Sequence, residues 1–290
     1  MRRRASGFTL VELIVVIVII GAIAGVLVLQ VKPALQSYLA VGQRANLVNQ
    51  ADTALHRIVN DVRIAVPNSL RLVATAAPAA QCLELVPTID GGRFRAQGDP
   101  SNSAAAAFDP ERPTQAFDIL TTLKPEVAAG DFFVIGNANG SDIYETANVN
   151  RAPLAAAPAA SPAGAGAGTA RITLQGAPSF DGSYQGSRFL VVPQATQVLG
   201  YACVNPGVGA DGSGTGILYR TVRNFGAGAS CPTGAASAAV LATRVSACTF
   251  VYRANQGATQ QSGYLQMTLG LSDGGQRAAL TLGAHVENIP

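Results

Sequence analysis

The stretch Gly7-Phe8-Thr9-Leu10-Val11-Glu12, followed by an apolar run from Leu13 to Leu29, decides how this chain is built. The run is 17 residues long and carries no charge, and a membrane-spanning helix needs roughly 17–25 such residues. Glu12 stands at its start. A carboxylate in a membrane helix costs roughly 2.5–3.5 kcal/mol on insertion scales. We therefore expect Glu12 to have a role and a partner.

The flanks of the run predict its orientation. Arg2, Arg3 and Arg4 precede it, and Lys32 follows it. The positive-inside rule places the basic leader in the cytoplasm and residues 33–290 across the membrane. The leader is too short for an ordinary secretory signal, whose cleavage site follows the apolar region. Here a plausible cleavage site precedes the apolar run.

A short basic leader, Gly, Phe-Thr-Leu-x-Glu and about twenty apolar residues together resemble the type IV prepilin family, which includes the pseudopilins of type II secretion. The resemblance implies that Gly7 ends a leader of residues 1–7, which a prepilin peptidase/methyltransferase removes. Phe8 then becomes an N-methylated N-terminus. Glu12 is expected to pair with the N-terminal ammonium of a neighbouring subunit. The competing interpretation, a signal anchor that happens to contain a glutamate, leaves a buried carboxylate without a partner.

The helical pattern continues beyond the apolar run. Residues 8–31 are expected to form a transmembrane or filament-core helix. Residues 32–66 continue it as an amphipathic half, because apolar residues recur there at three- and four-residue spacing. Pro33 predicts a kink, and Pro67 predicts the end of the helix before it. A helix over residues 9–65 would be roughly 85 Å long.

Composition limits the function of the rest of the chain. The 290 residues carry a formal charge of +3, which loss of the three leader arginines reduces to zero. No electrostatic case for nucleic-acid binding survives this processing. The 31 Gly and 16 Pro residues indicate an extracytoplasmic, loop-rich β domain. Its length, about 225 residues, is enough for a core of its own.

Residues 67–290 are therefore predicted to be an extracytoplasmic β-rich domain. No βαβ alternation appears, so the fold class is α+β: a long N-terminal helix packed on an antiparallel β-sheet domain of one or two sheets. A short helix is expected near 237–244, and a flexible surface insertion at about 152–169. The predicted strands are 82–87, 117–123, 131–136, 171–175, 188–192, 197–204, 217–223, 248–253, 264–271 and 277–286.

Four cysteines, Cys82, Cys203, Cys231 and Cys248, are expected to face an oxidising compartment. No CxxC pair occurs, and a zinc site is not expected. Two disulfides can connect in three ways. The strand-like surroundings of Cys203 and Cys248 favour that pair, which leaves Cys82 with Cys231.

No catalytic pattern is present, so we expect no enzyme activity, no cofactor and no metal. His56 and His285 are expected to be surface or packing residues. The segment Asn137–Asp142 faintly resembles a calcium loop but has one carboxylate, fewer than hard cations usually recruit. A solvated turn is favoured there and at Asp211.

Several later phrases carry a second resemblance: residues 66–71, 83–88, 91–95, 218–220, 245–250 and 284–290. Together they resemble the MshO-type minor pilins of the MSHA pilus system, which are related to the J-type minor pseudopilins. The resemblance implies a helical spine with one or two antiparallel sheets. It also implies a low-abundance subunit that starts or caps a filament.

The resulting hypothesis is a minor type IV pilin. It would be inserted in the inner membrane with its bulk in the periplasm, processed, and then moved into a surface pilus. The partners implied are the peptidase, other major and minor pilins, the inner-membrane assembly platform and, before assembly, membrane lipid. Two alternatives stay open: a minor pseudopilin of type II secretion, and a tip adhesin or ligand-binding module.

Overall fold

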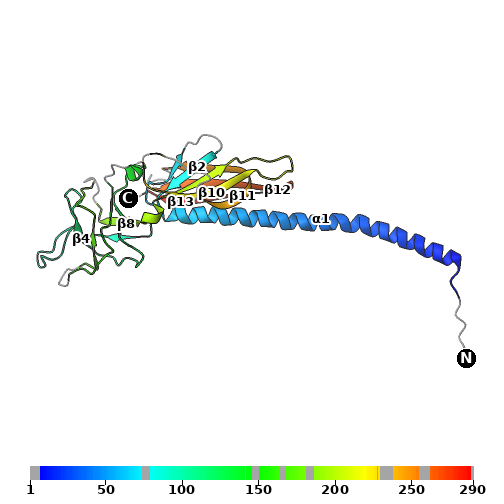
Figure 1. Ribbon diagram of the computed structural model, residues 1–290, viewed down its shortest axis with the longest axis horizontal. Coiled ribbons are helices and arrows are strands. Elements are labelled where there is room, and N and C mark those ends of the chain that lie inside the picture. Colours follow the sequence, from blue (N-terminus) through cyan, green and yellow to red (C-terminus); the bar gives the residue numbers. More distant parts are fainter. Residues whose placement is uncertain are drawn as a thin grey trace, which may run out of the picture.

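A computed structural model describes residues 7–73, 79–140, 142–145, 150–162, 168–180, 186–226, 228, 238–254 and 262–288. The structure consists of one long helix, α1 (Leu10–Arg63), and a large antiparallel β region that packs on its second half (Figure 1). The first half of α1 projects away from the β region. The predicted α+β class is confirmed.

Helix α1 is continuous through Pro33 and curves gently (Figure 1). It ends before Pro67, as predicted. Thr88 closes this end, because its backbone N–H and its hydroxyl both donate to the carbonyl oxygen of Ile64, at 2.9 and 2.7 Å. A carbonyl that has no partner within the helix is thereby satisfied.

The main sheet has seven strands, and every neighbouring pair is antiparallel. In spatial order they are β1 (Arg71–Val73), β2 (Ala79–Leu85), β9 (Val198–Val204), β10 (Gly216–Arg223), β11 (Ala238–Arg253), β12 (Ser262–Asp273) and β13 (Gln276–Glu287).

The helix and this sheet share one core. The buried apolar stripe of α1 comprises Leu47, Ala51, Leu55, Ile58 and Val62, which recur every three or four residues on one face. It packs against sheet residues that include Leu265, Met267 and Leu269.

A buried polar contact lies within this interface. The carboxylate of Asp61 on α1 accepts hydrogen bonds from the Tyr201 hydroxyl and from Arg220 Nε, the latter at 3.0 Å. Arg57 Nε lies 3.4 Å from the same oxygen. Buried charges persist when they are paired in this way.

A second lobe is inserted between two neighbouring strands of the main sheet. Leu85 of β2 is paired with Leu199 of β9, so the chain leaves the sheet and returns to the same place. We call residues 86–197 the inserted lobe. Its four-stranded sheet has the order β3 (Asp90–Arg93), β8 (Arg188–Val192), β5 (Phe132–Val134) and β6 (Arg151–Pro153), and its two-stranded sheet pairs β4 (Ala116–Ile119) with β7 (Ala170–Thr173).

The inserted lobe has a hydrophobic core of its own, separate from that of the helix and main sheet. Aromatic rings dominate it, with centroids between 4.4 and 6.5 Å apart. Such pairs contribute about 0.5–1.5 kcal/mol beyond area burial. The clustered rings are Phe94, Phe108, Phe117, Phe133, Phe180 and Phe189. The described residues thus form three sheets, where the sequence suggested one or two.

The prediction of a short helix near 237–244 is wrong for the described residues, because 238–244 belong to β11. Residue 237 lies outside the described part of the chain. Over these residues β11 pairs with β10, and its pairing with β12 begins at Val245. The backbone hydrogen bonds between the strands, together with the β-branched side chains of Val240, Thr243 and Val245, favour a strand here. They outweigh the helical tendency of the alanine-rich sequence.

The insertion expected at 152–169 is also partly wrong. Its first residues complete β6, and Ala152 and Leu154 are buried in the core of the inserted lobe. Leu154 N–H donates to the Asp131 carbonyl at 2.7 Å. Residues 163–167 lie outside the described part of the chain.

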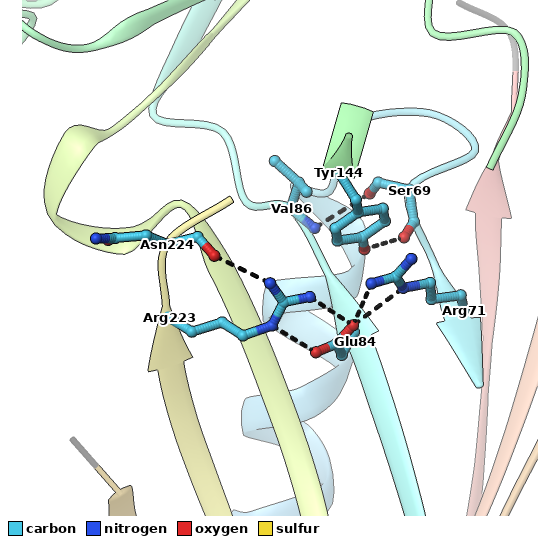
Figure 2. A network of polar contacts seen from close by, with 7 residues as sticks. All are labelled: Ser69, Arg71, Glu84, Val86, Tyr144, Arg223 and Asn224. Atoms are coloured by element: carbon cyan, nitrogen blue, oxygen red, sulfur yellow. Dashed lines mark hydrogen bonds and ion pairs between the residues drawn. The ribbon is translucent and has the colours of Figure 1, made fainter. Parts of the chain in front are cut away.

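A buried ion network joins the inserted lobe to the main sheet (Figure 2). Glu84 on β2 is fully buried and accepts from Arg71 Nη2 at 2.7 Å and Arg223 Nε at 2.8 Å. The Arg71 guanidinium lies 3.5 Å from the ring centroid of Tyr144, which belongs to the short 3-10 helix η1 (Asp142–Tyr144) of the inserted lobe. Burial raises the pKa of Tyr144 well above its usual value, so its hydroxyl stays protonated and donates to the Ser69 carbonyl.

Glu84→Gln should destabilise the chain strongly, because it leaves two guanidinium groups without their countercharge. Breaking a buried ion pair costs about 3–5 kcal/mol. The midpoint of urea unfolding in detergent should fall accordingly. Glu126→Gln, at an exposed position of the inserted lobe, should change stability by less than about 0.5 kcal/mol. Equal midpoints for the two variants would contradict the role of the network.

Candidate functional site

The N-terminal end of α1 is closed by a capping box. Thr9 is the N-cap residue, with extended backbone angles of φ −79° and ψ 150°. Its hydroxyl accepts from the Glu12 N–H at 3.3 Å, and the Glu12 carboxylate accepts from the Thr9 N–H at 3.0 Å. This reciprocal pair satisfies two backbone donors that the helix itself cannot.

The capping box gives Glu12 a partner within its own chain, which the sequence analysis missed. The Thr-x-x-Glu spacing of residues 9–12 was the signal that could have revealed it. Both Thr9 donors, the N–H and the hydroxyl, bond to Oε2. An ionised carboxylate has about four acceptor positions, so Glu12 can accept a further donor. Its predicted pairing with a neighbouring ammonium stays a prediction.

The N-terminal part of the chain, which includes the capping box, forms an exposed apolar segment. We use this name for residues 8–41, whose large apolar side chains, from Phe8 to Val41, all lie on the surface of the single chain. The helix that carries them is long and apolar enough to cross a membrane, which is consistent with a membrane-anchored protein. Burial on α1 begins only at Leu47. Leu35 and Leu39, which lie in the half that was predicted to be amphipathic, are exposed.

Two glycines on this segment have open space around them. A Cβ atom added at Gly21 or Gly25 would meet no atom within 4 Å. Gly7, at the predicted cleavage site, is equally open and exposed. Arg2, Arg3 and Arg4 lie outside the described residues.

The cysteines lie far from this end of the molecule, in the main sheet. Cys203 on β9 and Cys248 on β11 form a disulfide with Cα atoms 6.3 Å apart, the pairing that the strand-like contexts favoured. Cys82 on β2 is also disulfide-bonded and is buried. Cys231, its expected partner, lies outside the described residues.

The remaining polar candidates are scattered through the fold. His56 is exposed on α1 and lies 3.0 Å from the Asp52 carbonyl, whereas His285 on β13 packs against the Tyr264 ring. Asn137 is buried and donates to the Pro67 carbonyl at 2.7 Å. Asp211 closes its own turn by accepting from the Ser213 N–H at 3.0 Å. Within the described ranges, no three side chains of the metal-ligating types gather.

Thr9→Ala should fray the start of α1, because it removes the hydroxyl that accepts from Glu12. Loss of an N-cap costs about 0.5–2 kcal/mol. Amide hydrogen exchange at residues 10–12, measured by NMR in detergent micelles, should speed up severalfold. Thr9→Ser retains the hydroxyl and should exchange like the parent chain. Equal exchange rates in the alanine and serine variants would refute the capping role.

Comparison with known proteins agrees with this geometry. Residues 2–28 match the family model described as the prokaryotic N-terminal methylation motif. Neither a curated protein nor a solved structure matches the chain. The match covers Gly7, Phe8, Glu12 and the apolar segment as far as residue 28. The chain therefore carries the signal of a type IV pilin-like or pseudopilin-like protein that is processed by a prepilin peptidase.

Proposed function

We propose that this chain is a minor type IV pilin-like subunit, most similar to the MSHA type, that acts at the start or the tip of a pilus. One observation carries the proposal: the methylation motif lies on a helix whose first half is apolar and exposed, while its second half is the core of a folded domain. Such a helix can leave a membrane only for another apolar environment. The packed helices of a filament supply one.

Processing changes the electrostatics of the helix start. Cleavage after Gly7 creates an ammonium on Phe8, directly before the N-cap Thr9. The N-terminal end of a helix carries a partial positive charge, so the new ammonium is unfavourable there unless an anion lies close. Glu12, one turn into the helix, supplies that anion either to its own chain or to a neighbour.

Pairing between neighbouring subunits gives a partner to both the Phe8 ammonium and the Glu12 carboxylate. The Thr9 bonds already lower the cost of placing the Glu12 carboxylate in an apolar environment. The carboxylate keeps acceptor capacity for a second donor. An ammonium from the adjacent subunit would use that capacity and would set the axial position of one subunit against the next.

The structure also favours a second candidate role, recognition at the filament tip. The inserted lobe lies at the end of the molecule opposite the N-terminus (Figure 1). If the apolar segment is held in a membrane or filament core, this lobe is the part that extends farthest from it. A minor pseudopilin of type II secretion remains the alternative within the same superfamily. In either case the chain begins in the inner membrane with its bulk in the periplasm.

Gly7→Leu should block processing, because a bulky side chain replaces the open position next to the cleaved bond. Intact-mass spectrometry of the membrane fraction should find the full-length precursor. Gly98→Leu, at another glycine with open space around it, should yield the normal mature chain. A mature N-terminus at Phe8 in the Gly7→Leu variant would refute this cleavage site.

Glu12→Ala should leave insertion and cleavage intact but reduce recovery of the chain in sheared filaments by at least about tenfold, since a lost buried ion pair costs about 3–5 kcal/mol. Glu12→Gln separates two explanations, because glutamine can close a capping box without a charge. If charge pairing matters, Gln should be as defective as Ala. Normal incorporation of the glutamine variant would sink the ammonium-pairing role and leave only capping.

A further inference from the structure

Strand β13 is a long edge strand whose own sequence gives little protection to its centre. The main sheet ends on one side at β1, which has 3 residues and lies against β11. It ends on the other side at β13, which has 12 residues and, among the described strands, pairs with β12 alone. Natural edge strands avoid unwanted pairing by being short or by carrying proline, bulges or charges.

The middle of β13 has none of these features. The strand contains no proline, and its register with β12 is regular from Gln276 to Glu287. The exposed side chains at its centre, Ala279, Thr281 and Gly283, are small and uncharged. Among the described strands, none pairs with the outward-pointing backbone groups of this stretch.

The direction of β13 is fixed relative to the helix. Near its start, Gln276 Oε1 accepts from Arg44 Nε at 2.7 Å. At its end, Glu287 lines one cavity together with Val62 and Ile64. Strand β13 therefore runs alongside the second half of α1 in the same direction (Figure 1). A subunit whose helix packs beside α1 would bring its own domain next to this edge.

We propose that the outer edge of β13 accepts a β-strand from a different pilin-like subunit and so extends the main sheet across the two chains. The inference rests on the proposed function, since it takes assembly with other pilins as given. The added strand would be held by backbone hydrogen bonds. Leu280 and Leu282, which face the helix side and are only half-buried, would be covered by alternating apolar side chains of the partner.

The geometry disfavours a second copy of this chain as the partner. Antiparallel pairing of two identical β13 strands would also set their two α1 helices antiparallel, because each strand runs with its own helix. Two chains anchored in one membrane need parallel helices. The other edge strand, β1, is too short to match β13. A different subunit can present an antiparallel edge while its helix stays parallel to α1.

Site-specific photo-crosslinking in assembling cells tests this contact. The photo-reactive amino acid p-benzoylphenylalanine replaces Thr281 in the full chain. The matched control replaces Thr249, which is exposed on the same cross-strand row, Thr249–Thr268–Thr281, but lies on the inner strand β11. Position 281 should crosslink to a different pilin-like protein, identified by mass spectrometry, at least about fivefold more than position 249.

Each of the other possible outcomes contradicts a specific part of the proposal. Crosslinking of position 281 mainly to a second copy would overturn the choice of partner. Equal crosslinking from both positions, or none from 281 while the mature chain is present in filaments, would overturn the edge contact and leave the proposed function intact. A chain that is absent from every filament would count against the proposed function itself.

Hydrogen–deuterium exchange separates strand pairing from mere proximity. Half of the β13 amides point away from β12, because bonding directions alternate along a strand. These amides should exchange at least about tenfold more slowly in sheared filaments than in the detergent-solubilised subunit, whereas the amides of β11 should not change. A crosslink at 281 without this protection would contradict backbone pairing.

Discussion

The contact between the buried stripe of α1 and the seven-stranded sheet is the constraint on which the rest of the structure depends. The apolar side chains of one face of the sheet are buried against Leu47, Leu55 and Ile58 of α1. The same contact leaves the preceding turns of the helix without any protein around them. One continuous helix is thus exposed over its first half and buried against the sheet over its second half. Whatever holds the apolar segment also positions the β region.

Polar groups set the details of this contact. Asp61 would be costly in an apolar interface, but Tyr201 and Arg220 reach it from the sheet. Because buried pairs lose their benefit when the geometry changes, this contact favours one position of the helix on the sheet. Glu84 plays the same part between the main sheet and the inserted lobe, through Arg71 and the Tyr144 ring above it (Figure 2).

The inserted lobe changes how the β region is understood. A single large domain was expected over residues 67–290, yet residues 86–197 leave and rejoin the main sheet at the adjacent positions Leu85 and Leu199. The lobe has its own phenylalanine-rich core. The exposed apolar segment and the inserted lobe therefore lie in different parts of one chain.

The local sequence was sufficient to predict the features that depend on residues close together in the chain. The apolar run and the end of the helix before Pro67 follow from hydropathy and from the restricted backbone of a residue that precedes proline, whereas the Gly7–Phe8 cleavage site and the pairing of Glu12 are predictions from the resemblance to prepilins. The capping box was equally local and was readable from Thr9 and Glu12. The first half of strand β11 was misread as a helix because its state depends on pairing with β10, which lies elsewhere in the sequence.

The sequence alone determined that this chain has a processed, apolar N-terminal helix and an antiparallel β region. Only the tertiary structure decided that a lobe is inserted between β2 and β9, that Arg71 and Arg223 meet at Glu84, and that β13 forms an open edge along α1. The physical reason is range. Hydropathy and capping act within a few residues of the chain, whereas strand order and buried ion pairs can join distant residues, such as Arg223 and Glu84, which are 139 positions apart.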